Sequence, residues 1–221
     1  MTYSLYRERI KTLGDISFGK KYEIWDEIVD KQVYVICKTP MAKQITKRTL
    51  LGYRNGKTNM HAFDDLIMQL KDKSDKFIEK VTKKSFWGKG GNEKMKFDAI
   101  VGNPPYQVMD GGHGSSSQAL YNYFVITALA INPHFVSMIM PSRWMTGGKG
   151  LDTFREYMLN NKHIIILHDY MNANRCFTNA SIEGGVCYFL NDRDVEKECE
   201  VYLHKADGTI SVSYTHLRAH E

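Results

Sequence analysis

The stretch FDAIVGNPPYQ, residues 97–107, decides how this 221-residue sequence folds. Its first half is a short apolar run, and Gly102 and Asn103 then lead into two consecutive prolines. Proline has a fixed φ and no backbone N–H, so it ends a strand and stiffens the chain that follows. We therefore predict a strand over residues 97–101 that ends in a rigid, polar turn.

Strands and helices alternate after this turn. The apolar patterns predict helices over residues 120–130 and 152–159, and strands over residues 135–140, 164–167 and 186–190. Continuous apolar strands that alternate with helices indicate an α/β fold whose sheet is buried on both faces. In such sheets the binding site lies just beyond the carboxyl ends of the strands, which is where residues 103–106 fall.

The N-terminal part of the sequence carries local signals. Residues 23–29 have helix-like composition, and residues 33–36 form a β-rich run. A helix is predicted for PMAKQITKRTLL, residues 40–51, because proline is favoured in a first turn. Apolar positions at helical spacing predict another helix over residues 62–81.

The composition argues against a membrane protein and against a metal or disulfide framework. Mean hydropathy is −0.41, and no run approaches the roughly eighteen apolar residues of a membrane helix. The N-terminus lacks the apolar core of a signal peptide, so we expect a soluble, cytoplasmic protein. The four cysteines show no CxxC spacing and the eight histidines no HExxH pair, so no metal site is expected.

The formal net charge of the whole sequence is +5. One lysine-rich segment has nine lysines and four acids, so its own net charge is also +5. Its lysines are Lys71, Lys73, Lys76, Lys80, Lys83, Lys84, Lys89, Lys94 and Lys96, and its acids are Asp72, Asp75, Glu79 and Glu93. A solvated helix face explains this pattern. A surface that meets nucleic-acid phosphates explains it as well.

The NPPY turn can present two hydrogen-bond acceptors side by side. These are the side-chain oxygen of Asn103 and the backbone oxygen of Pro104, with no backbone donor from either proline. Such a pair suits a planar –NH2 group, and the ring of Tyr106 can stack on a flat heterocycle. Accepting both hydrogens of a nucleobase amine stabilises the positive charge that develops as its nitrogen attacks an electrophile. A base inside a duplex must first be flipped out to reach the turn. A plain proline-rich turn is the alternative.

At these residues the sequence resembles the amino-group DNA methyltransferases, in particular the adenine-N6 enzymes. The branch it resembles is that of restriction–modification proteins in which methylase and endonuclease can share a chain. The segments that carry the resemblance are FDAIVGNPPYQVMDGGHGSSS, FVSMIMPSRWMTGGKGLDTFREYML and CFTNASIEGGVCYFLNDRD. The resemblance implies a Rossmann-like methyltransferase fold and methyl transfer from S-adenosylmethionine to adenine in double-stranded DNA. It leaves room for a fused or associated restriction endonuclease outside these residues.

The resemblance also assigns residues to the site. Asn103, Pro104, Pro105 and Tyr106 carry over as the catalytic turn, and Phe177 as a second ring on the flipped base. For Phe177 a place in the core is an equal alternative. Arg143 and Trp144 follow a predicted strand and are expected near the site, where Arg143 could contact phosphate. For Arg143 the alternative is an ordinary surface position.

Two features of the resembling proteins are missing. No glycine-rich turn follows a first strand, and Ile36–Cys37–Lys38 stands where an acid would hold the ribose. The cofactor-binding residues therefore stay unassigned, and we expect a fold that is incomplete at the N-terminus. We divide the chain into residues 1–95, residues 96–195 with the catalytic turn, and an extension of residues 196–221. Residues 213–221 resemble translated adapter sequence and are expected to be a non-native tail.

Two other functions stay open. An NPPY turn could hold the side-chain amide of a protein glutamine by the same geometry. Alternatively, the chain is an inactive fragment that binds nucleic acid.

Overall fold

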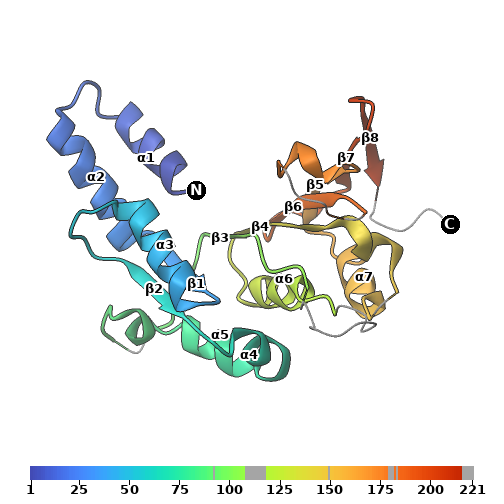
Figure 1. The fold of residues 1–221 in the computed structure, drawn as a ribbon, viewed down its shortest axis with the longest axis horizontal. Coiled ribbons are helices and arrows are strands. Elements are labelled where there is room, and N and C mark those ends of the chain that lie inside the picture. The colour runs from blue at the N-terminus through green and yellow to red at the C-terminus, as the bar shows by residue number, and fades with distance from the viewer. Residues whose placement is uncertain (92, 108–117, 149, 179–181, 183, 216–221) are drawn as a thin grey trace. The chain divides into compact units, whose positions relative to one another are not determined.

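The computed structural model describes the chain except residues 92, 108–117, 149, 179–181, 183 and 216–221. It divides into two compact units, Met1–Met95 and Lys96–Glu221. Each unit contains its own sheet of strands (Figure 1). In the described part of the chain, no helix combines the length and apolar character needed to cross a bilayer.

The first unit is built around a pair of parallel strands, β1 (Tyr34–Cys37) and β2 (Asn59–Ala62). Its helical elements are α1 (Thr2–Lys11), α2 (Phe18–Lys31), α3 (Pro40–Leu51), α4 (Leu66–Asp72), α5 (Ser74–Val81) and the 3-10 turn η1 (Lys84–Trp87). Ile24 and Ile28 of α2 and Val33 before β1 form a buried apolar cluster in this unit.

The helix α3 has the bounds that the sequence predicts, because its signals are local. The Thr39 side chain accepts a hydrogen bond from the Ala42 N–H at 3.1 Å, which caps the first turn, and Pro40 occupies that turn. Gly52, with φ of 62°, stands at the end of the helix.

The prediction of one helix over residues 62–81 is wrong. Ala62 belongs to β2, and the helical part is interrupted at Lys73, whose φ of −140° and ψ of 33° are not helical. The buried residues Leu70 and Phe77 lie on either side of the break and seven positions apart. This spacing equals two helical turns, so the apolar period continues through the interruption and conceals it.

The second unit contains a six-stranded mixed sheet in the order β3-β4-β6-β5-β7-β8. The strands are β3 (Ala99–Gly102), β4 (Phe135–Pro141), β5 (Ile164–Tyr170), β6 (Val186–Asp192), β7 (Cys199–His204) and β8 (Ile210–Thr215). The helical elements are α6 (Tyr121–Ala130), η2 (Ser142–Thr146), α7 (Asp152–Leu159) and η3 (Ala173–Arg175). The predicted α/β class is confirmed, and the sheet is mixed because β6 runs antiparallel to both of its neighbours.

This strand order brings several chain segments to one edge of the sheet. β3 and β4 are parallel, and β5 and β7 are parallel. β6 lies between β4 and β5 and is antiparallel to both, so β4 and β5 also run in the same direction. We call the edge where β3, β4, β5 and β7 end, and where β6 begins, the carboxyl edge.

The core of the second unit lies between the sheet and the two helices α6 and α7, which cover one face of it (Figure 1). Val125 of α6, Met158 of α7 and Val136, Met140 and Phe189 of the sheet are fully buried there. Burial of a large apolar side chain contributes about 1.5–3 kcal/mol. This layer therefore holds the strand ends that carry the candidate site.

The last part of the described chain continues this sheet. β7 pairs with β5, and β8 pairs with β7 from Ile210 to Thr215. Ser213, Tyr214 and Thr215 of the expected non-native tail are therefore part of a strand, and the rest of that tail lies outside the described residues. The origin of the tail stays a prediction.

Candidate active site

The structure places the NPPY turn and the SRW segment at the same edge of the sheet. Asn103 follows the last residue of β3, and Ser142 follows the last residue of β4. The two strands are parallel and in register, with Ala99 opposite Phe135. Both segments therefore lie at the carboxyl edge, where ligands bind in open α/β sheets, although β4 extends to Pro141, three residues beyond Met138, the partner of Gly102.

Neither predicted acceptor of the turn is occupied by a hydrogen bond within the described residues. Asn103 is exposed and Pro104 is buried. Among the residues that the structure describes, neither the Asn103 side chain nor the Pro104 carbonyl oxygen has a hydrogen-bond partner. The turn thus has the acceptors that the proposed chemistry requires, and the catalytic roles of residues 103–106 stay predictions.

A hydrogen bond holds the backbone of Tyr106, and the hydroxyl end of its side chain is buried. Its carbonyl oxygen accepts a hydrogen bond from the Leu120 N–H at 3.1 Å. Its hydroxyl is buried and has no hydrogen-bond partner among the described residues. Burial raises the pKa of Tyr106 to about 12, and the nearby thiols of Cys187 and Cys176 contribute to that rise. The hydroxyl is therefore neutral at physiological pH, and the ring is held with this end in the protein.

The change Tyr106→Phe is expected to leave the stability unchanged or to raise it by up to about 1 kcal/mol. The reason is that it removes a buried hydroxyl without a partner in the described chain. The ring face is retained, so the methyl-transfer activity that the resemblance implies should stay within about threefold of the unaltered protein, whereas Tyr106→Ala loses the stacking surface. Thermal melting and steady-state kinetics of both variants test this. A clear loss of stability in Tyr106→Phe would contradict it.

Trp144 does not face an open site. Its side chain is 0% exposed, its Nε1–H donates to the Cys187 Sγ at 3.3 Å, and its ring packs edge-on against Phe154. The expectation that Trp144 contacts substrate is therefore incorrect. The 3-10 turn η2 that follows Pro141 places the indole in the core, and this depends on contacts that the local sequence does not encode.

Arg143 is half-buried at the start of the same turn. A Cβ at Gly184 would lie 3.9 Å from the Arg143 Cβ, which is ordinary van der Waals contact. Burial raises the pKa of the Tyr121 hydroxyl, and Arg143 is close enough to oppose that rise. Arg143 therefore lies at the carboxyl edge and near the start of α6.

Phe177 follows η3 and is half-buried, and its N–H donates to the Ala173 carbonyl oxygen at 2.9 Å. The thiol of the preceding residue, Cys176, is within electrostatic range of the Tyr106 hydroxyl. The structure thus brings this segment to the neighbourhood of Tyr106. The role of Phe177 as a second ring on the flipped base stays a prediction.

A polar corner at the carboxyl edge was not predicted from the sequence. The Ser142 Oγ–H donates to the Asp169 Oδ1 at 2.5 Å, and the Ser142 N–H donates to the Gly185 carbonyl oxygen at 3.2 Å. The sequence prediction ends the strand at Leu167, whereas β5 continues to Tyr170. Extending the strand by three residues would have placed Asp169 at its carboxyl end beside Ser142.

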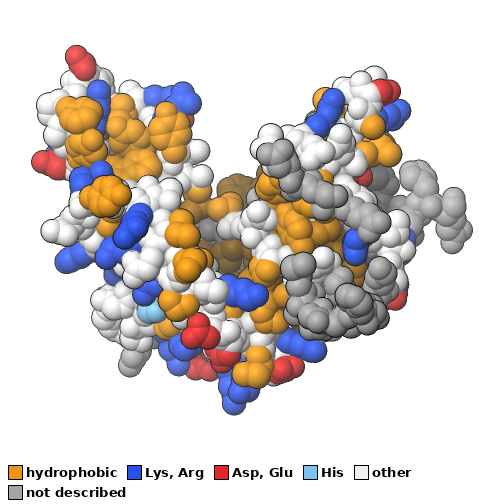
Figure 2. Space-filling model, in the orientation of Figure 1, with side chains coloured by type: hydrophobic (Ala, Val, Ile, Leu, Met, Phe, Trp, Pro, Cys, Tyr) orange, Lys and Arg blue, Asp and Glu red, His pale blue; other side chains and the backbone are white. Residues whose placement is uncertain are grey.

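The lysine-rich segment is partly neutralised within the first unit. Lys83 pairs with Glu79 at 2.7 Å, Lys84 pairs with Glu93, and Lys89 pairs with Asp30 at 3.3 Å. Lys and Arg side chains are dispersed among other residue types on the face that Figure 2 shows. The contribution of this segment to nucleic-acid binding stays a prediction.

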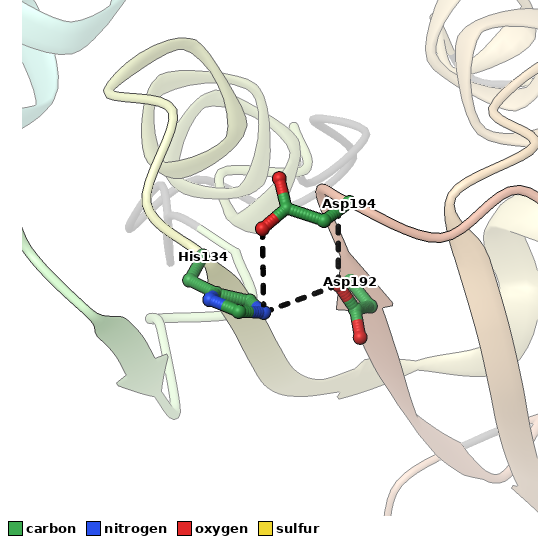
Figure 3. A group of neighbouring side chains, drawn as sticks. All are labelled: His134, Asp192 and Asp194. Atoms are coloured by element: carbon green, nitrogen blue, oxygen red, sulfur yellow. Dashed lines mark hydrogen bonds and ion pairs between the residues drawn. The ribbon is translucent and has the colours of Figure 1, made fainter.

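A separate group of polar side chains lies at the opposite end of β4 and β6. The His134 Nε2 is 3.4 Å from the Asp192 Oδ1 and 3.6 Å from the Asp194 Oδ2 (Figure 3). The three potential ligand atoms lie within 4.8 Å of one another. Arg193 donates to both oxygens of Asp194, at 2.9 and 3.3 Å, and this holds the pKa of Asp194 below its usual range. We interpret the group as a polar cluster, with one Arg193–Asp194 ion pair, at the ends of the two strands.

The fold and the turn together define a class of protein. A mixed α/β sheet with an NPPY turn at the end of a parallel strand is the arrangement of the amino-group methyltransferases described above. A family model, the Eco57I restriction-modification methylase, matches residues 31–177, which is most of the chain. The chain belongs to the Eco57I restriction-modification methylase family.

The chain is also similar to a curated relative in sequence and to solved structures in fold. An uncharacterized adenine-specific methylase of Mycoplasma pneumoniae is 35% identical over 99 residues, which cover 43% of this chain and 24% of that protein. The modification subunit of a putative type I restriction enzyme from Vibrio vulnificus has a TM-score of 0.53 at 10% identity, over 87% of this chain and 38% of its own. The DrdV–DNA complex has a TM-score of 0.52 at 14% identity, over 88% of this chain and 24% of its own. These structures support the fold, and the chain spans about a quarter of the length of the Mycoplasma relative.

Membership in a methylase family implies dependence on S-adenosylmethionine. At the carboxyl ends of the parallel pair β1 and β2, the chain supplies Lys38 after β1, and Asp64 and Asp65 after β2. Asp65 accepts from the Gln69 Nε2 at 2.6 Å, whereas Asp64 is exposed and could accept a hydrogen bond from an amine or a hydroxyl. No carboxylate directly follows β1. The described residues therefore do not make up a complete site for this cofactor.

Proposed function

We propose that this chain is the catalytic part of a site-specific, adenine-N6 DNA methyltransferase of a restriction–modification system. The observation that carries the proposal is the NPPY turn at the carboxyl end of β3, in a chain of this methylase family. The acceptors of Asn103 and Pro104 there have no partner within the described residues. S-adenosylmethionine would supply the methyl group.

The residues of this chain perform the part of the reaction that concerns the base. The target adenine leaves the duplex and enters the carboxyl edge, where Tyr106 covers one face and Phe177 the other. The amide oxygen of Asn103 and the carbonyl oxygen of Pro104 each accept one hydrogen of the exocyclic amine. These fixed dipoles favour the positive charge that develops on nitrogen, so they bind the transition state more tightly than the ground state.

The finer assignment concerns the architecture of the complete protein. We infer that it belongs to the branch in which methylase and endonuclease share a chain, because the three segments quoted above resemble that branch. A DNA-cleavage assay on the full-length gene product tests this, since a protein that only methylates would leave its substrate intact.

The central experiment measures transfer of a radiolabelled methyl group from S-adenosylmethionine. The full-length gene product is incubated with DNA, or with a glutamine-containing protein as the alternative acceptor. Digestion of the DNA to nucleosides should show label in N6-methyladenine. Label in glutamine alone, or no label in either acceptor, would contradict the proposal.

A further inference from the structure

We propose that Asp169 is a positioning residue for this methyl transfer, because it fixes Ser142 and thereby the turn that carries Arg143 at the carboxyl edge. The inference rests on the proposed function. It adds a residue on β5 that the NPPY chemistry does not use.

The geometry of the corner ties three strand ends together. Ser142 directly follows β4, its side chain donates to Asp169 near the end of β5, and its backbone N–H donates to Gly185 just before β6. Arg143 is the next residue along the chain, so the position of its backbone depends on how Ser142 is held. The Ser142 Oγ and the Asp169 Oδ1 are 2.5 Å apart, which is a close hydrogen bond.

Asp169 occupies a place where a carboxylate is costly. It stands opposite Cys187 in the β5–β6 register, and Met140 is opposite the same cysteine in the β4–β6 register. Cys187 and Met140 are both 0% exposed. Within the described residues, Ser142 is the one hydrogen-bond donor to this carboxylate. Asp169 itself is half-buried, and a carboxylate in this apolar setting with a single donor is a candidate for a functional role.

Three groups from neighbouring elements affect the charge of Asp169. Burial raises the pKa of its carboxyl, while the hydrogen bond from Ser142 and the nearby His204 of β7 oppose that rise. From β6, Cys187 is neutral, because burial raises the pKa of its thiol to about 12. Burial thus acts on the Asp169 carboxyl toward a higher pKa, against the effects of Ser142 and His204.

The corner is connected to the NPPY turn through the start of α6. Arg143 is close to the Tyr121 hydroxyl, and Tyr121 follows Leu120, whose N–H holds the Tyr106 carbonyl oxygen. A guanidinium at this position suits a DNA phosphate beside the flipped nucleotide. Asp169 would thus act on the reaction through Ser142 and Arg143, without touching the reacting atoms.

The pKa direction predicts opposite effects of Asp169→Asn on stability and activity. A carboxyl whose pKa is higher in the folded than in the unfolded chain binds protons more tightly when folded. Stability therefore falls as pH rises through the window between the ordinary and the raised value. At pH 8 the introduced asparagine carries no desolvated charge and can still accept from Ser142, so the melting temperature should stay equal or rise. If Asp169 had a purely structural role, Asp169→Asn would lower the melting temperature, and the folded variant would keep its activity.

The experiment compares Asp169→Asn with Glu200→Gln in the full-length protein. Glu200 lies on β7, on the sheet face opposite Asp169, and binds Lys197. Melting temperatures and the pH dependence of kcat/KM for DNA are measured for both variants and for the unaltered protein. We expect Asp169→Asn to lose about 10- to 100-fold in kcat/KM, as displaced positioning groups do, with no loss of melting temperature. The pH profile of kcat/KM for Asp169→Asn should also lack the fall at low pH that Glu200→Gln and the unaltered protein share.

A double variant controls for indirect effects. Asp169→Asn combined with Arg143→Ala should lose no more activity than Arg143→Ala alone, because both act through one group. Unaltered kcat/KM in Asp169→Asn, additive losses in the double variant, or an activity loss that follows a fall in melting temperature would each overturn the inference. In those cases the unaltered protein still methylates DNA and the proposed function stands. Absence of methyl transfer by the unaltered protein contradicts both.

Discussion

Replacing Asn103 with alanine is expected to reduce methyl transfer by about 100- to 1000-fold, the loss seen when one preorganised dipole is removed from a transition state. The amide oxygen is one of the two acceptors that the turn offers, and a methyl group in its place accepts nothing. The effect should fall on kcat, because the acceptor is needed most when charge develops on the amine nitrogen. Single-turnover transfer of labelled methyl groups to DNA measures it.

The stability of Asn103→Ala should be unchanged, because the side chain is exposed and makes no hydrogen bond within the described chain. The matched control is Asn160→Ala, at the exposed end of α7 and remote in sequence from the turn. That variant should keep full activity. If Asn103→Ala were as active as Asn160→Ala, the catalytic role of the turn would be wrong.

The second large effect concerns folding. Gly185 has φ of 80°, and a Cβ at this position would lie 2.3 Å from the Tyr170 carbonyl oxygen. Gly185→Ala combines a left-handed backbone, which costs about 1–2 kcal/mol, with an overlap that the backbone of β5 must move to relieve. We expect a total loss of about 3 kcal/mol or more and a fall in melting temperature of roughly 10 °C.

Gly148→Ala separates the two contributions. Gly148 has φ of 75°, and nothing lies within 4 Å of where its Cβ would be. This variant should show the backbone cost alone, about 1–2 kcal/mol. Thermal and urea unfolding of both variants provide the comparison. Equal losses in the two would show that the close approach of Gly185 to Tyr170 is unimportant.

The elements that the sequence predicts well are those whose signals are local. Thr39 and Pro40 begin α3 with a cap and a first-turn proline, and the two prolines after Asn103 end β3. These signals depend on a few neighbouring residues, so no knowledge of the tertiary structure is needed. The place of the NPPY turn after a strand of an α/β fold follows from the same information.

The elements that the sequence prediction lacks depend on distant partners. β2, with the sequence NMHA, has little strand character of its own and exists through parallel pairing with β1. In the sequence CEVYLH of β7, apolar and polar residues do not alternate regularly. This segment forms a strand through its parallel pairing with β5. β8 was partly assigned to a tail, which concealed its pairing with β7.

The same distinction holds within the candidate site. Asn103 and Tyr106 could be identified from the sequence because they lie in one short motif whose chemistry can be recognised locally. Asp169 and Ser142 are 27 positions apart, and only the antiparallel insertion of β6 between β4 and β5 brings their strand ends together. Trp144 shows the opposite error, since a residue close in sequence to the site is removed from it by a single 3-10 turn.

The burial of Trp144 gives the second unit its own spectroscopic reporter. The chain has three tryptophans, and the other two, Trp25 and Trp87, lie in the first unit. An indole enclosed by apolar groups emits at short wavelength, and a thiol in contact with it, here that of Cys187, quenches this light. With Trp25 and Trp87 changed to phenylalanine, a red shift and a brightening of the remaining fluorescence would report the opening of this half of the molecule alone.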